Sequence, residues 1–181
     1  MNGWKSYFDK LLNNNTIPDE EENKITAGPE LPINVNLFSE EELLYAIKSL
    51  KNGKSPGIDS DITSEIVKYG GTQIKSVLLK ICNKVYTDLV PPKQWTTNII
   101  IPIPKKGDIH KMSNFRGICL MSTGAKLFNR MLLNRIYEHV NPRISITQAG
   151  FRRKMNCVQQ INTLRMIIES MNDKNLPLIA S

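Results

Sequence analysis

Cysteine and histidine are scarce in this 181-residue chain. The three cysteines, Cys82, Cys119 and Cys157, lie far apart and form no CxxC pair, which excludes a disulfide framework. We expect all three to be reduced thiols in the core. The two histidines, His110 and His139, have no Cys or His at ligand spacing, so the sequence also excludes an ordinary zinc site.

Long hydrophobic runs are missing as well. No apolar run approaches the roughly 20 residues that a membrane-spanning helix needs, so we expect no membrane partner. The N-terminal stretch MNGWKSYFDKLLNNN lacks the charged-then-apolar order of a secretory signal. Both absences predict an intracellular protein.

The net excess of positive charge lies entirely in the second half of the chain. Residues 1–36 carry three basic and six acidic residues (net −3), residues 37–90 carry seven of each, and residues 91–181 carry fourteen basic and four acidic residues (net +10). A polyanion would therefore bind the second half. A basic surface that serves only solubility fits the charge equally well.

Residues with the spacing of a catalytic site are also lacking. The stretch NGKS (residues 52–55) ends like a phosphate-binding loop, but that pattern needs a glycine where Lys48 stands and a strand where a helix is predicted. Asp59 and Asp61 have the spacing of a metal site, yet turn closure and helix capping explain them better. No nucleophile–base set and no carboxylate pair on a strand is evident.

The pattern of apolar residues predicts a mostly helical α+β protein with one β-hairpin. Residues 13–36 are acidic and proline-rich, and follow a short amphipathic helix; we assign residues 1–36 to a partly disordered linker and residues 37–181 to a folded part. Ser39 and Glu42 form a capping box for a helix that Gly53 ends. The further expected elements are helices 62–69, 74–89, 123–140 and 158–171, strands 98–103 and 115–120, and the opening of a buried strand in LPLIAS (176–181).

The predicted hairpin is the strongest candidate for a binding site. The stretch IIIPIPKKGD (99–108) begins as a strand and ends in a basic loop, and its prolines require that strand to be an edge strand or to leave the sheet there. Lys105, Lys106 and Lys111 cluster in the loop, and alternation lets Arg116 point away from the Phe115 face. A guanidinium fork beside flexible ammonium groups suits a polyphosphate or a nucleic-acid backbone. A solvated basic turn, or an Arg116 bonded to its own hairpin, is the alternative.

A second basic cluster follows Gly150-Phe151. Arg152, Arg153 and Lys154 are consecutive, and Lys126 and Arg130, four residues apart on the preceding helix, could extend the cluster. Adjacent cations repel each other and are stabilised beside phosphates, but three in a row are also common in a solvated loop.

Four segments in this order resemble the fingers half of reverse transcriptases from non-LTR (LINE-type) retrotransposons. They are LKNGKSPGID (50–59), IPIPKKGD (101–108) preceded by Trp95, NFRGICLMS (114–122) followed by a lysine, and QAGFR (148–152). The resemblance runs from about Phe38 to the C-terminus. It implies the fingers and the start of the palm of a right-hand polymerase, in the nucleus and cytoplasm, after a segment that follows an endonuclease domain.

The resemblance also implies roles for single residues. Lys105, Lys106 and Arg116 would touch the triphosphate of an incoming deoxynucleotide. The residues expected along the RNA template and DNA primer are Lys51, Lys54, Gln148, Arg152, Arg153 and Lys154. Mg²⁺ is expected only in the complete polymerase, which includes the palm and thumb of the same polypeptide, and none is expected on this chain.

Two features depart from the family pattern. Residues 154–157 (KMNC) replace a Gly-x-Arg-Ser-like segment, and LPLIAS resembles the strand that leads to the first catalytic aspartate, where the chain stops. We therefore expect a fragment that is inactive by itself. The alternative is a non-catalytic RNA-binding module, or a dead truncated copy, derived from such a polymerase.

Overall fold

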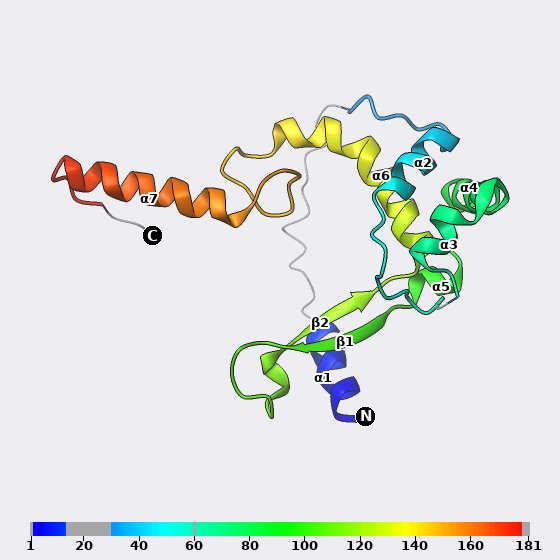
Figure 1. Cartoon of the computed structure of the whole chain (residues 1–181), viewed down its shortest axis with the longest axis horizontal. Helices are drawn as coiled ribbons and strands as arrows, with labels where there is room; N and C mark the ends of the chain where they lie inside the picture. The colour runs from blue at the N-terminus through cyan, green and yellow to red at the C-terminus, as the bar shows by residue number, and fades with distance from the viewer. Residues whose placement is uncertain (1, 14–29, 60, 179–181) are drawn as a thin grey trace. The chain divides into compact units, whose positions relative to one another are not determined.

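The computed structural model describes residues 2–13, 30–59 and 61–178 (Figure 1). The chain divides into two compact units, residues 1–134 and residues 135–181. In chain order the elements are α1 (Asn2–Leu12), α2 (Glu40–Lys48), α3 (Ser64–Tyr69), α4 (Gly71–Asp88), α5 (Lys93–Thr96), β1 (Ile99–Pro104), the 3-10 turn η2 (Met112–Asn114), β2 (Phe115–Leu120), α6 (Thr123–Val140), the 3-10 turn η3 (Asn141–Arg143) and α7 (Cys157–Asp173).

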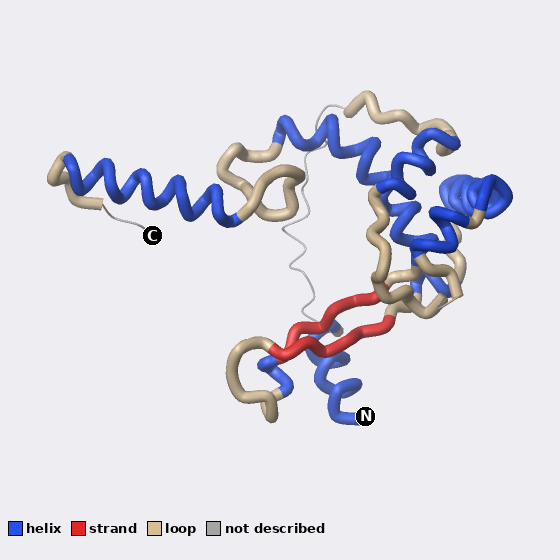
Figure 2. The backbone as a smooth tube through the Cα atoms, viewed as in Figure 1, coloured by secondary structure: helices blue, strands red, loops and turns tan. Residues whose placement is uncertain are grey.

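The predicted α+β class is confirmed. β1 and β2 form a two-stranded antiparallel sheet, and helices make up the remaining regular structure (Figure 2). Both strands are therefore edge strands, which accommodates Pro102 and Pro104 because neither can donate to a ladder. The α1 helix, the hairpin and the three longest later helices lie within a few residues of their predicted bounds. Across the described residues, every helix is too short or too polar to cross a bilayer.

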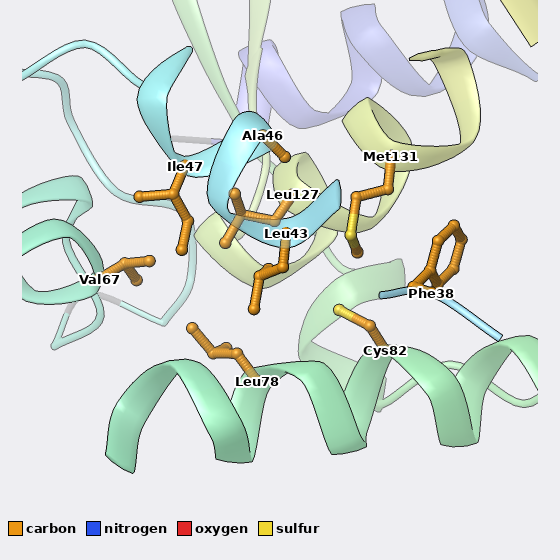
Figure 3. Packing of buried hydrophobic residues seen from close by; sticks show 9 residues of the cluster. All are labelled: Phe38, Leu43, Ala46, Ile47, Val67, Leu78, Cys82, Leu127 and Met131. Carbon is orange, nitrogen blue, oxygen red and sulfur yellow. The ribbon is translucent and has the colours of Figure 1, made fainter. Parts of the chain in front are cut away.

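One apolar core holds the helices of the first unit together. Figure 3 shows side chains from α2, α3, α4 and α6 converging on Leu43, which is completely buried. The helix α2 is set by its cap, because Ser39 accepts a hydrogen bond from the Glu42 amide and the Glu42 carboxylate accepts one from the Ser39 amide, as predicted. Asn83 on α4 fixes the entry to α2, since its side-chain amide bonds both the N–H (2.7 Å) and the carbonyl (3.0 Å) of Phe38.

Three local expectations were wrong. Helix α2 ends at Lys48, five residues before Gly53, which lies in the following turn. Thr63, and not Asp61, caps α3, because the Thr63 hydroxyl accepts the Ile66 amide. Of the three cysteines only Cys82 is buried, where desolvation raises the pKa of its thiol to about 12.

The two other cysteines, Cys119 and Cys157, are exposed. Cys119 lies on β2 of a sheet that has only two strands in the described residues, so little structure is available to bury it. Cys157 is the first residue of α7. Apolar character alone therefore did not identify core positions in these segments.

The first turn of α6 is the point where several loops of the first unit meet. Gly57 lies so close to the Met121–Ser122 backbone that a Cβ would come within 2.5 Å of it, so this position has no room for a side chain. The carboxyl group of Asp59 accepts the Thr123 backbone amide, and the Thr123 hydroxyl donates to the Ile62 carbonyl (2.6 Å). These contacts fix the 50–63 loop onto the beginning of α6.

The second unit has few buried residues. In α7 the expected apolar face is present by spacing, but Val158, Ile161, Leu164 and Ile168 are all exposed. The helix begins at Cys157 and is capped by Asn156, whose side chain forms a capping box with Gln159. The predicted strand in LPLIAS is not observed at residues 176–178, and its last three residues lie outside the described ones.

Candidate nucleotide and nucleic-acid interface

One face of the hairpin is covered by α1. Pairing of Pro102 with Gly117 and of Pro104 with Phe115 places these four residues on the same face. The Trp4 and Phe115 rings meet edge to face with centroids 4.8 Å apart. At Gly117, a Cβ would lie 2.6 Å from the Phe8 ring, so Phe8 occupies the space of the absent side chain. The short helix that was expected to be amphipathic thus packs its aromatic residues on the sheet. Figure 1 shows α1 beside the two strands.

The opposite face of the hairpin is open and carries Arg116. Arg116 pairs with Ile103, and Ile118 pairs with Ile101, so these side chains share the face that α1 does not cover. All four are exposed. Within the described part of the chain, the Arg116 guanidinium forms no hydrogen bond or salt bridge. The structure therefore does not show the alternative arrangement, in which the Arg116 guanidinium is hydrogen-bonded to carbonyls of its own hairpin.

The basic loop that follows β1 has a defined shape. The Lys105 amide donates to the Asn114 carbonyl (2.6 Å), and its ammonium donates to the Ser113 carbonyl (3.0 Å). Asp108 closes the turn, because its carboxylate accepts the His110 amide and its carbonyl accepts the Asn114 side chain. An ammonium has three N–H donors, so Lys105 keeps donors for a ligand. Lys106 and Lys111 are exposed on the same loop.

The loop that contains Lys51 and Lys54 is anchored through other residues. The Asn52 side chain donates to the Tyr69 hydroxyl and accepts a bond from the Lys68 ammonium (2.6 Å). The Gly53 amide donates to the Glu65 carboxylate (2.6 Å), and this bond lowers the pKa of Glu65. A carboxylate therefore occupies the place that a phosphate would take in a nucleotide-binding loop, which agrees with rejecting that interpretation of NGKS.

A groove joins this loop to α6. Its volume is about 450 Å³, and Lys51 and Lys54 line it together with Lys126 and Arg130. The prediction that Lys126 and Arg130 extend the cluster after Gly150 stays a prediction. The structure places both beside the 50–55 loop, and no sequence signal links segments that are more than 70 residues apart. The remaining lining residues are Ser49, Leu50, Ser64, Met121, Asn129 and Leu133.

In the second unit, Arg152 is bound by its own loop. Its guanidinium donates to the Ser145 carbonyl (2.9 Å), to the Gln148 carbonyl (3.4 Å) and to both the side chain (3.2 Å) and the carbonyl (3.4 Å) of Asn141. Arg152 thus cross-links residues 141–152. The role on the template or primer that the family resemblance implies for it stays a prediction.

The neighbours of Arg152 are arranged differently. The Arg153 guanidinium lies 4.3 Å from the centre of the Tyr137 ring, a cation–π contact within the same unit. Lys154 and the side chain of Gln148 are exposed. Phe151 and Lys154 both have left-handed backbone conformations, with φ of 60° and 63°, so the QAGFRRK loop contains two sharp bends.

The described residues do not fit a two-metal centre. They contain no group of three His, Cys, Asp or Glu side chains that could hold a metal ion. Asp59 is bonded to the Thr123 amide, and burial raises the pKa of its carboxyl group. We therefore derive no catalytic step through Mg²⁺ for this part of the chain.

The described residues thus combine an open hairpin face that carries Arg116, a basic loop and a basic groove. Comparison with known proteins identifies the family. The chain is 33% identical over 138 residues to the Drosophila melanogaster protein named "Probable RNA-directed DNA polymerase from transposon BS". It is 29% identical over 153 residues to the 115 kDa protein in the type-1 retrotransposable element R1DM of the same species. No protein-family model matches the chain.

This chain belongs to the reverse transcriptases of non-LTR retrotransposons, as the four motif segments indicated. The matched regions cover 74% and 83% of this chain, but only 15% and 14% of the two relatives. The chain thus spans a small part of the length of the curated relatives it matches.

Proposed function

We propose that this chain supplies the part of a retrotransposon RNA-directed DNA polymerase that holds the incoming deoxynucleotide and contacts the template–primer. The hairpin with Lys105, Lys106 and Arg116 forms the triphosphate site, as part of the fingers. Residues 37–181 form the beginning of the reverse transcriptase domain and act with the palm and thumb of the same polypeptide. The chain by itself does not polymerise, because its described residues do not bring together the carboxylates that a two-metal mechanism needs.

The observation that carries the proposal is the state of Arg116. Its guanidinium lies on the exposed face of the hairpin and has no partner among the described residues, and the adjoining loop holds Lys105 in a fixed position. A guanidinium can bind two phosphate oxygens at once. A non-catalytic RNA-binding module has no observation of its own in support, since both relatives belong to transposable elements and one is named as a polymerase.

Replacing Arg116 in the full-length polymerase that contains this chain tests the proposal. Arg116→Ala should lower kcat/KM for the deoxynucleotide about tenfold to a hundredfold, because charge-assisted hydrogen bonds contribute roughly 1.5–3 kcal/mol each. Arg116→Lys should restore only part of this loss, since it keeps the charge without the fork. Template–primer affinity and the melting temperature should change little.

The matched control is Lys84→Ala, which removes one exposed positive charge from α4. It should leave nucleotide use unchanged. If Arg116→Ala instead reduced nucleotide efficiency, duplex affinity and thermal stability together, Arg116 would be a structural residue and the triphosphate site would lie elsewhere.

A further inference from the structure

We infer that the groove between the 50–55 loop and α6 binds the phosphate backbone of a single nucleic-acid strand, through Lys51, Lys54, Lys126 and Arg130. This inference deepens the proposed function, on which it rests. It assigns strand binding to α6, whose two cations the sequence had grouped with a different loop. It concerns a site in the first unit alone.

The charge of the groove is of one sign. Four of its ten lining residues are basic and none is acidic, so an anion inside it meets attraction from two sides. Among the described residues, none of these four side chains forms a salt bridge or a hydrogen bond. Two carboxylates lie close to these cations: Asp59 interacts electrostatically with Lys126, and Glu65 accepts the Gly53 amide in the loop that carries Lys51 and Lys54. Two carboxylates cannot neutralise four cations.

The cations are held on rigid supports. Lys126 and Arg130 are one turn apart on α6, about 6 Å along the axis, so each can contact a different phosphate of the same strand. The loop opposite is fixed by the bonds of Asn52 and Gly53 to α3, none of which uses the ammonium of Lys51 or Lys54. Binding a strand therefore orders only side chains, and the backbone is already in place.

The remaining lining residues suit a sugar–phosphate chain better than a compact ion. Ser49, Ser64 and Asn129 offer neutral hydrogen-bonding groups, and Leu50, Met121 and Leu133 offer apolar surface on which a sugar or base can rest. The groove is also open, with Lys51, Lys54 and Asn129 exposed, so a chain can enter and leave it. A free polyphosphate would use the cations but not this apolar surface.

The test uses the 181-residue chain and a fluorescent 20-nucleotide RNA, with no deoxynucleotide present. The double variant Lys126→Gln/Arg130→Gln should weaken binding about tenfold or more, and should reduce the slope of log affinity against log salt by about 1.4, as expected for two phosphate contacts on a single strand. Lys51→Gln/Lys54→Gln should behave alike. The control Lys80→Gln/Lys84→Gln removes the same charge from exposed positions of α4 and should change affinity less than about twofold.

A second measurement needs no variant. Acetylation of the wild-type chain, read by mass spectrometry, should show that RNA protects Lys51, Lys54 and Lys126 but leaves Lys80 and Lys84 reactive. Tripolyphosphate at the same phosphate concentration should protect them less.

Equal losses for the groove and control variants, or an unprotected Lys126, would overturn the inference, and stronger protection by tripolyphosphate would assign the groove to a small polyphosphate. The RNA-binding assay contains no nucleotide, so a negative outcome of the Arg116 test does not change the conclusion about the groove. A negative outcome of the RNA-binding assay likewise does not change the conclusion about Arg116.

Discussion

Arg116 and Arg152 look alike in the sequence but have opposite surroundings in the structure. Each follows a phenylalanine within a short motif, and each was assigned to a phosphate because of its charge. The structure leaves the Arg116 guanidinium open on a sheet face and gives Arg152 four hydrogen bonds to its own loop. Strand alternation could predict the first arrangement. The arrangement around Arg152 depends on the conformation of the irregular loop of residues 141–152, and hydrophobic periodicity does not predict the conformation of such a loop.

Arg152 should therefore act mainly on local stability. Arg152→Ala removes the guanidinium donor from the carbonyls of Asn141, Ser145 and Gln148, of which the first two keep a backbone N–H partner. We expect the loop of residues 141–155 to lose about 2 kcal/mol, which corresponds to roughly thirtyfold faster hydrogen exchange of its amides. Arg152→Lys should recover little, because one ammonium cannot reach four acceptors. Lys154→Ala, which removes the same charge from an exposed neighbour, is the control. Loss of RNA binding with unchanged exchange would show instead that Arg152 contacts nucleic acid.

At the scale of elements, helices and strands could be read from the sequence far better than their contacts. The bounds of β2 and α6 were predicted to the residue, because Phe115–Leu120 and Thr123–Val140 have clear periods. The meeting of Gly57, Asp59 and Thr123 was not predicted. It depends on a missing Cβ and on buried hydrogen bonds between segments about 60 residues apart, and these leave no local pattern.

The contact between α1 and the hairpin was also not predicted, and it should stabilise the nucleotide site. Phe8→Ala removes a buried ring from Gly117, at a cost of about 3 kcal/mol, and should detach α1 from the sheet. In a Trp95→Phe background, Trp4 fluorescence reports this detachment as a red shift. Leu11→Ala, at an exposed position of the same helix, should cause no shift. An unchanged Trp4 spectrum in Phe8→Ala would mean that α1 does not depend on this contact.

At the scale of the whole molecule, burial is unequal between the two units. The large core cluster around Leu43 lies in the first unit, whereas Ala149 is the one buried apolar residue among the described residues of the second. Periodicity predicted an apolar face on α7, and this face exists. What covers it could not be predicted, because periodicity identifies an amphipathic helix without identifying its partner.

Hydrogen exchange should therefore divide the chain at about residue 135. Amides of α4 and of the first half of α6 should show protection that approaches the free energy of global unfolding. Those of α7 should exchange nearly as fast as in an unfolded peptide, since a 17-residue helix without tertiary burial is marginal in water. Its capping box adds about 1 kcal/mol and the exposed Arg165–Glu169 pair about 0.3–0.5 kcal/mol, which is too little to change this.

Concentration supplies the control for this prediction. If the α7 helices of two chains cover each other's apolar faces, protection of the α7 amides from exchange should rise with protein concentration, by mass action. Protection of the α4 amides should stay constant. Replacing Ile161 and Leu164, both exposed, with serine should abolish the rise and leave the first unit unaffected. Protection of α7 by more than about 3 kcal/mol in the dilute monomer would contradict the assignment, because it would require burial that the second unit does not have.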